Sequence, residues 1–203
     1  MIELVVATGN KGKLKEIREA LSDMDVNVIS VMDFPDAPEV EEDGDTFLEN
    51  ATKKAVETAK HTGMIALADD SGLVVDALEG RPGVYSARYA GEDATDEMNN
   101  EKLLAEMEGV LDDKRTAWFV AVIVVATPEG EIITAEGKSG GTITHEPTGD
   151  KGFGYDPLFY NEKAGKTFAE MEGAEKLSVS HRGAALREMK KKLPAWLDKV
   201  GAG

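Results

Sequence analysis

Apolar positions in the first part of the chain follow strand and helix periods in turn. Residues 2–7 form a continuous apolar run, which predicts a buried strand. Apolar residues then recur at helical spacing, at Leu14, Ile17, Leu21 and Met24. Residues 26–31 predict a second strand, and the two prolines of residues 33–39 predict a loop. The order is therefore strand, helix, strand and loop.

The next segments continue this alternation and end in a hairpin. A helix is predicted by the stripe Leu48, Ala51, Ala55 and Ala59. Residues 64–68 and 73–78 predict two strands around a turn, and residues 96–107 predict a surface helix. Residues 116–126 and 131–138 predict a long antiparallel hairpin, with a further strand at 141–145. The final helix has its buried stripe at Leu186, Met189 and Leu193, and Pro194 is predicted to stop it.

This pattern predicts an α/β fold with a mixed sheet that has parallel and antiparallel parts. Residues 1–203 are long enough for one substantial core, and they show no internal repeat or low-complexity linker. We therefore expect a single domain with two lobes.

Composition limits the possible partners and compartments. The 39 acidic and 23 basic side chains give a net charge of -16, which opposes binding to a nucleic acid polymer or an anionic membrane. The longest apolar run, residues 118–126, is too short to span a bilayer. The absence of cysteine excludes disulfides and thiolate ligands and is compatible with a reducing cytoplasm. We expect a soluble, cytoplasmic protein.

Two adjacent carboxylates, Asp69 and Asp70, follow the apolar run 64–68 and precede Ser71-Gly72. At about 4 Å apart such carboxylates repel by about 4 kcal/mol at an effective dielectric of 20, so a cation or a lysine is the expected partner. Because successive strand residues point to opposite faces, one of the two acids should enter a site. An ordinary strand end followed by a turn is the competing interpretation.

Several other stretches offer groups for phosphates or a metal ion. The glycine-containing segment 8–13 opens a predicted helix, which favours anions, although an ordinary turn capped by Asn10 explains it equally well. The acidic run 41–45 and Lys54 form a candidate metal and phosphate corner, against the alternative of a solvated face. His181 and Arg182 lie at a helix start that disfavours cations, which argues for an anionic partner, against the alternative that both lie in solvent or pair with one of the many acids.

The loop 149–157 holds two aromatic residues among glycines, where an aromatic ring either stacks on a base or caps a core. Together with the carboxylates and lysines, these groups suit magnesium and a phosphate substrate, since magnesium typically uses one or two carboxylates and substrate phosphates. No serine, histidine and acid order indicates a nucleophilic triad. Metal-assisted attack of water on a phosphoanhydride uses these residue types most economically.

Six motifs carry a resemblance to a known family. They are Thr8-Gly9-Asn10-Lys11-Gly12-Lys13, Thr46-Phe47-Leu48-Glu49-Asn50-Ala51, Ala68-Asp69-Asp70-Ser71-Gly72, Pro82-Gly83-Val84-Tyr85-Ser86-Ala87-Arg88, Phe153-Gly154-Tyr155-Asp156-Pro157 and Ser180-His181-Arg182-Gly183. In this order and spacing they resemble the inosine triphosphate pyrophosphatase family, and more narrowly its bacterial dITP/XTP pyrophosphatase branch. Residues 93–113 and 138–145 lack a recognisable motif.

The resemblance implies a magnesium-dependent enzyme that hydrolyses non-standard purine nucleoside triphosphates, such as ITP, dITP and XTP, to the monophosphate and pyrophosphate. It also implies an elongated α/β fold with flanking helices, two lobes around a central cleft, and a homodimer. The open alternatives are a hydrolase of other nucleoside triphosphates, such as modified pyrimidines, and a nucleotide-binding regulatory module without turnover.

Site residues are carried over motif by motif. Asp70 would be the general base and lie on or near magnesium, and Glu41 would be a second metal carboxylate, with Glu42 as the competing choice. Asp69 would hold the turn or lie behind the site. Substrate binding would involve Thr8, Gly9, Asn10, Lys11, Gly12, Lys13, Lys54, Ser71, Phe153, Gly154, Tyr155, Asp156, Lys176, His181 and Arg182, with Phe153 stacking on the base.

Overall fold

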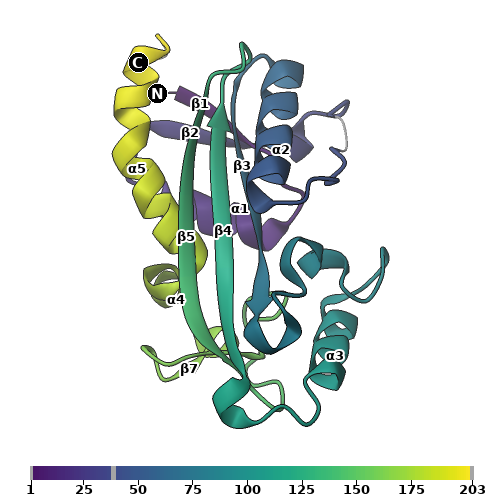
Figure 1. Ribbon diagram of the computed structural model, residues 1–203. Helices are drawn as coiled ribbons and strands as arrows, with labels where there is room; N and C mark the ends of the chain where they lie inside the picture. Colours follow the sequence, from purple (N-terminus) through teal and green to yellow (C-terminus); the bar gives the residue numbers. More distant parts are fainter. Residues whose placement is uncertain (1, 38–39, 202–203) are drawn as a thin grey trace. The chain divides into compact units, whose positions relative to one another are not determined.

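The computed structural model describes residues 2–37 and 40–201 of the chain (Figure 1). A seven-stranded sheet in this part of the chain has the order β2-β1-β3-β4-β5-β6-β7. β1 runs parallel to β2 and β3, whereas β6 runs antiparallel to β5 and β7, which confirms the predicted mixed sheet. The strands are β1 (Ile2–Val6), β2 (Val26–Ser30), β3 (Ile65–Val75), β4 (Thr116–Ala126), β5 (Ile132–Ile143), β6 (Phe159–Asn161) and β7 (Lys166–Thr167).

The flanking helices are α1 (Lys11–Ala20), α2 (Phe47–Thr62), α3 (Asp96–Glu106), α4 (Gly173–Val179) and α5 (His181–Lys199). The chain divides into two compact units. The first consists of Met1–Asp70, Ala121–Gly137 and Arg182–Gly203, and the second of Ser71–Val120 and Lys138–His181. Residues 38 and 39 of the predicted loop lie outside the described residues.

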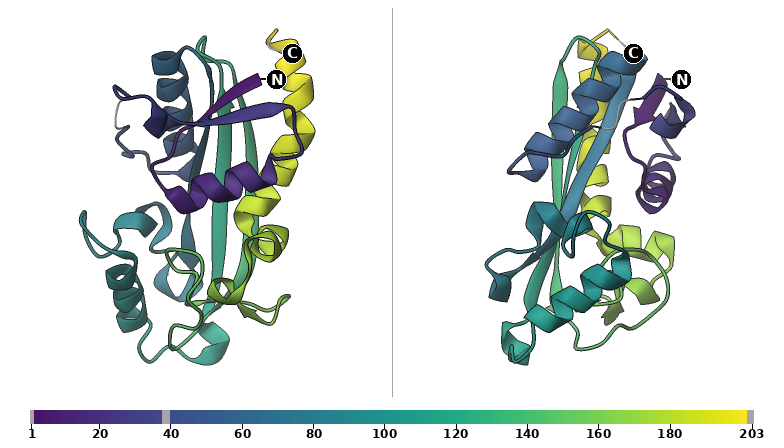
Figure 2. Two further views of the ribbon diagram at one scale, coloured as in Figure 1. Left: turned by 180° about the vertical axis from the view of Figure 1, so that it is seen from behind. Right: turned by 90° about the vertical axis from the view of Figure 1, so that its right-hand side faces the viewer.

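In the first unit, helices cover both faces of the sheet (Figure 2). Ala66 and Ala68 pack with Ala51, Ala55 and Ala59 of α2. These three alanines confirm most of the predicted buried stripe, but Leu48, its first member, is exposed because it lies in the first turn of the helix, outside this core. Ile65 and Leu67 pack on the other face with α1 and α5. Since side chains alternate along a strand, this packing decides which face each following residue of β3 occupies.

The second unit has an aromatic core. Phe119, Phe159 and Phe168 contact one another, with ring centroids 4.7 Å apart for the first two and 4.8 Å for the last two. α3 packs into this core through Leu103 and Met107. The buried Arg115 donates to the carbonyl of Met107 at the end of α3, where the helix dipole favours a cation.

The predicted turn at Asp69 and Asp70 is wrong, because β3 runs without a break from Ile65 to Val75. Most of the two predicted strands, 64–68 and 73–78, is one strand with both acids in its middle, and residues 76–78 form a short 3-10 helix instead. Two carboxylates and a glycine are unusual within β3, since Asp and Gly are disfavoured in strands. The strand persists because both acids find cations, as described below.

Two other boundaries differ from the prediction. β5 continues from Ile132 to Ile143 through the glycine pair that separates the two predicted strands. At Gly141 a Cβ atom would lie 2.3 Å from the carbonyl oxygen of Tyr160, so close pairing with β6 requires glycine here. Pro194 does not stop α5, which continues to Lys199. Proline removes one helical hydrogen bond, but the burial of Trp196 and Leu197 beyond it offsets this loss.

Candidate active site

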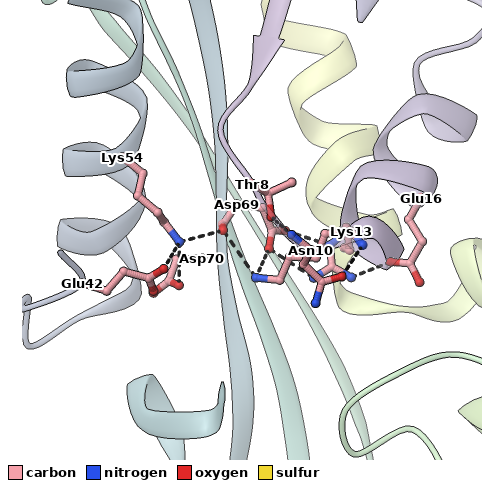
Figure 3. Close-up of polar contacts among 9 residues, drawn as sticks. Thr8, Asn10, Lys13, Glu16, Glu42, Lys54, Asp69 and Asp70 are labelled. Atoms are coloured by element: carbon pink, nitrogen blue, oxygen red, sulfur yellow. Dashed lines mark hydrogen bonds and ion pairs between the residues drawn. The ribbon is translucent and has the colours of Figure 1, made fainter. Parts of the chain in front are cut away.

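Asp69 and Asp70 leave β3 on opposite sides, each toward its own set of charged groups (Figure 3). The residue count explains this arrangement, because Asp69 follows Ile65 and Leu67 on the face of α1 and α5, whereas Asp70 follows Ala66 and Ala68 on the face of α2. Both side chains are buried. One short segment of strand therefore serves two different charge clusters.

On the face of Asp70, α2 supplies the cation. The helix begins at Thr46, whose hydroxyl accepts from the backbone N–H of Glu49 while the Glu49 carboxylate accepts from that of Thr46. Lys54 lies about two turns further on and is almost fully buried. Its Nζ lies 3.2 Å from Oδ1 of Asp70 and 3.1 Å from Oε1 of Glu42.

This cluster has one lysine for two carboxylates, so it carries surplus negative charge. Oδ2 of Asp70 is buried and finds no hydrogen-bond partner among the described residues. Burial raises the pKa of Asp70 against the opposing charges of Lys54 and Lys13, and the negative charge of Glu42 adds to the rise. Burial acts in the same direction on Glu42, but Lys54 outweighs it and lowers the pKa of Glu42.

These donors fit a hard divalent cation. Two carboxylates, one of them with an unpaired buried oxygen, are the type of protein ligand that such a cation takes when ligand oxygens complete its coordination. The described residues include no group of three or more His, Cys, Asp or Glu that could hold a metal ion. Two carboxylates would leave most coordination positions of such a cation to oxygens of water or of a bound ligand.

The structure separates Glu41 from Glu42. Glu42 is half-buried and contacts Lys54, whereas Glu41 is exposed. Glu42 is therefore the acid of the run 41–45 that the structure brings to Asp70. Neighbouring acids in a run cannot be distinguished by residue type, which is why the sequence leaves both open.

On the opposite face, Asp69 belongs to a buried and charge-balanced cluster. Its two carboxylate oxygens accept from Nε and Nη2 of Arg182, at 2.9 and 3.1 Å. Nζ of Lys13 lies 2.9 Å from Oδ1, and Nη1 of Arg182 also donates to Glu16. Burial opposes ionisation of Asp69, but Arg182 and Lys13 outweigh it and hold its pKa well below the usual range.

Arg182 is fully buried in this cluster. Burial disfavours its charge, yet Asp69 and Glu16 raise the pKa of Arg182 overall. Of the alternatives that the sequence leaves open for Arg182, the structure shows pairing with nearby acids, namely Asp69 and Glu16. Glu16 is a residue that the sequence analysis missed; it lies on the buried side of α1 next to Ile17, where a charged residue is itself a signal.

The glycine-containing segment leads from β1 into α1. Oδ1 of Asn10 accepts from the N–H of Lys13, so the predicted cap is present, and the hydroxyl of Thr8 accepts from the N–H of Asn10. Gly9, Asn10 and Lys11 are exposed, and Gly12 is half-buried. The start of α1 therefore presents backbone donors and a lysine, a combination that favours an anion.

In the second unit, the aromatic loop, residues 152–156, holds a different group of candidates. Nζ of Lys176 pairs with Asp156 and lies 4.5 Å from the centroid of the Phe153 ring. The Tyr155 hydroxyl donates to the carbonyl of Ser86, and burial raises the pKa of Tyr155 above its usual range. Phe153 is half-buried, whereas Asp156 and Lys176 are buried.

His181 lies in the same unit, with its ring stacked on Phe119 at 4.6 Å between centroids. Ser71 is half-buried in β3. The motif residue Ser86 has a structural task, because its hydroxyl accepts from the N–H of Leu73 and donates to the carbonyl of Gly83. This motif thus supports β3 and, through the Ser86 carbonyl, the aromatic loop.

The mixed sheet, the two acids of β3 and the lysines that contact them are the arrangement of an α/β enzyme that handles phosphates. The chain belongs to the Ham1 family, whose model matches residues 4–192. This result confirms the resemblance that the motifs show.

Relatives cover nearly the whole chain. It is 56% identical over 187 residues to the dITP/XTP pyrophosphatase of Desulforamulus reducens, covering 92% of this chain and 93% of that protein. It is also 56% identical to the protein of the same name from Geobacter sulfurreducens, covering 94% and 96%. A HAM1 protein structure from Coxiella burnetii superposes with a TM-score of 0.87 at 43% identity, covering 96% of this chain and 100% of that one.

Proposed function

We propose that this protein hydrolyses non-standard purine nucleoside triphosphates, such as ITP, dITP and XTP, to the nucleoside monophosphate and pyrophosphate. The observation that carries the proposal is the buried, unpaired Oδ2 of Asp70 beside Glu42 and Lys54. The relatives named dITP/XTP pyrophosphatase, which align along nearly the whole chain, support the substrate class.

Asp70 is the proposed general base. Its raised pKa makes it a better proton acceptor than an ordinary carboxylate, and its Oδ2 has no hydrogen-bond partner among the described residues. Lys54 holds Oδ1 of Asp70 and so aims Oδ2. A carboxylate that is fixed through one oxygen and free at the other suits this role.

Asp70 and Glu42 would hold Mg2+, with the exposed Glu41 as the alternative second carboxylate. When bound, magnesium neutralises charge on the triphosphate and on the departing pyrophosphate. The first unit also supplies Lys54, Lys13 and the segment Thr8-Gly9-Asn10-Lys11-Gly12 for phosphate oxygens. Arg182 donates to Asp69 and Glu16, so its contribution to phosphate binding is indirect and runs through Asp69.

The second unit supplies the groups for the purine. Phe153 would stack on the base, with its ring next to the Lys176 ammonium. A 6-keto purine offers an acceptor where adenine offers an amine donor, so a cationic donor at that edge rejects ATP. Lys176 and His181 are the candidates for that donor, and the remaining pocket residues are Ser71, Gly154, Tyr155 and Asp156.

We further propose that the protein acts as a homodimer in the cytoplasm, where the nucleotide pool that it would cleanse is found. Among residues 2–37 and 40–201, no helix is long and apolar enough to cross a bilayer.

The test measures pyrophosphate release from ITP, dITP, XTP, GTP, ATP and a modified pyrimidine triphosphate, each with magnesium and with a chelator. We expect magnesium-dependent release that is faster with ITP, dITP and XTP than with ATP, GTP or the pyrimidine. Faster release from the pyrimidine would overturn the substrate class, and bound nucleotide that persists intact with magnesium would overturn the assignment as an enzyme.

A further inference from the structure

Helix α3 contacts the aromatic loop through two side chains one helical turn apart. Oδ2 of Asp96 accepts from the N–H of Gly154 at 2.6 Å. Nδ2 of Asn100 donates to the carbonyl of Gly154 at 3.0 Å. Residues four apart lie on the same side of a helix, so α3 holds both backbone groups of one residue.

The two contacts act on a residue whose backbone has wide conformational freedom. Gly154 has a φ of 62°, in the left-handed region that glycine adopts readily. Its N–H belongs to the peptide plane that follows Phe153, and its carbonyl belongs to the plane that precedes Tyr155. Holding both planes therefore fixes φ and ψ of Gly154, and with them the direction in which the backbone leaves Phe153.

The side chain of Asn100 is better explained by this contact than by packing. Asn100 is 9% exposed, and its Oδ1 is buried without a hydrogen-bond partner among the described residues. An unpaired buried acceptor costs stability, so an apolar side chain would suit the position better if packing alone mattered. What Asn100 supplies is the donor to Gly154.

We propose that Asp96 and Asn100 are positioning residues that hold Phe153 in the orientation required to stack on the base. This inference rests on the proposed function. It assigns a role to the segment 93–113, in which the sequence shows no motif. The neighbouring Asn99 instead holds residues 87–90, through the carbonyl of Ala87 and the N–H of Ala90, so it does not share the task.

The test compares the variants D96A, D96N and N100L with the control E97Q. Glu97 lies in the same first turn of α3 and is exposed, so E97Q removes the same charge as D96N without touching Gly154. N100L removes the donor and also the unpaired acceptor, so it should fold at least as stably as the natural chain. D96N keeps an acceptor for Gly154 and serves as the conservative rescue.

Two ligands separate base recognition from phosphate binding: dITP as the substrate, and inorganic tripolyphosphate as a competitor without a base. We expect D96A and N100L to raise KM for dITP about 3- to 10-fold, the loss of one hydrogen bond, with an unchanged inhibition constant for tripolyphosphate. D96N should restore most of the affinity, and E97Q should match the natural chain. Unchanged KM in D96A and N100L, or equal weakening of both ligands, would overturn the proposal.

A second measurement does not depend on turnover. Hydrogen exchange of the Gly154 amide without nucleotide should be faster in D96A than in E97Q, because Asp96 accepts from this amide. Equal exchange in the two variants would refute the contact itself. Failure of the natural chain to release pyrophosphate from dITP would refute the proposed function. The hydrogen-exchange result would still decide whether α3 holds the loop.

Discussion

Replacing each acid of the pair by its amide should shift stability in opposite directions. In D69N, Arg182 and Lys13 lose the carboxylate that both contact, and the buried guanidinium keeps Glu16. Removing one partner of a buried ion pair costs about 3–5 kcal/mol. With an unfolding entropy of about 2.1 cal/mol/K per residue, the 203 residues predict a fall in Tm of about 7–12 °C.

D70N should leave Tm unchanged or raise it. Because the pKa of Asp70 is raised in the folded state, its ionisation opposes folding at neutral pH. The amide removes that cost, and Lys54 keeps Glu42 and the carbonyl of Asp69 as partners. Turnover, in contrast, should fall in D70N by about 10²- to 10⁴-fold, because this variant loses the proposed general base.

The pH dependence checks the sign of both effects. The lowered pKa of Asp69 stabilises the fold above the unfolded carboxyl pKa, and this contribution is lost only as pH falls through the lower folded value. The cost from Asp70 disappears earlier, as pH falls through its raised pKa toward the unfolded value. Near pH 4, therefore, D70N should match the natural chain while D69N still unfolds at a lower temperature.

Thermal unfolding by circular dichroism and pyrophosphate release from dITP are the two assays. A D69N variant as stable as the natural chain would refute the account of the buried cluster. A D70N variant that loses as much stability as D69N, or that keeps near-normal turnover, would refute the role of Asp70.

Four further variants test the remaining assignments. E42Q should raise the magnesium concentration for half-maximal activity by at least about tenfold, whereas E41Q should not change it; a magnesium titration of both decides which acid binds the metal. F153A should raise KM for dITP about 5- to 150-fold with little effect on inhibition by tripolyphosphate, and equal effects on both would exclude base stacking. R182K loses the two-point contact with Asp69, so it should lower Tm but leave the ratio of dITP to ATP turnover unchanged; a changed ratio would indicate that Arg182 touches the base.

Much of the fold can be predicted from apolar periodicity, because strands and helices with one buried face repeat at fixed spacing. The errors occur where local signals conflict with tertiary contacts. Asp69 and Asp70 indicate a turn in sequence, but cations from α1, α2 and α5 keep them in a strand. Pro194 indicates a helix end, but buried residues beyond it extend α5.

The candidate site, like the fold, could be predicted from the sequence only where local pattern decides the structure. Motifs and strand alternation correctly separate the two acids of β3, since alternation depends only on counting. Neither the choice of Glu42 nor the two partners of Arg182 could be obtained that way, because both depend on where distant segments meet. Asp96 and Asn100 were missed for the same reason, since their role depends on a glycine more than fifty residues away.

The carbonyl oxygen of Asp69 accepts from Lys54 at 3.1 Å and lies 3.5 Å from Nζ of Lys13. This acceptor belongs to the main chain, so no amino-acid substitution at position 69 removes it. Side-chain scanning would therefore report the carboxylate of Asp69 and overlook the oxygen that serves both lysines. Replacing the peptide bond after Asp69 by a thioamide would weaken that acceptor while leaving every side chain in place.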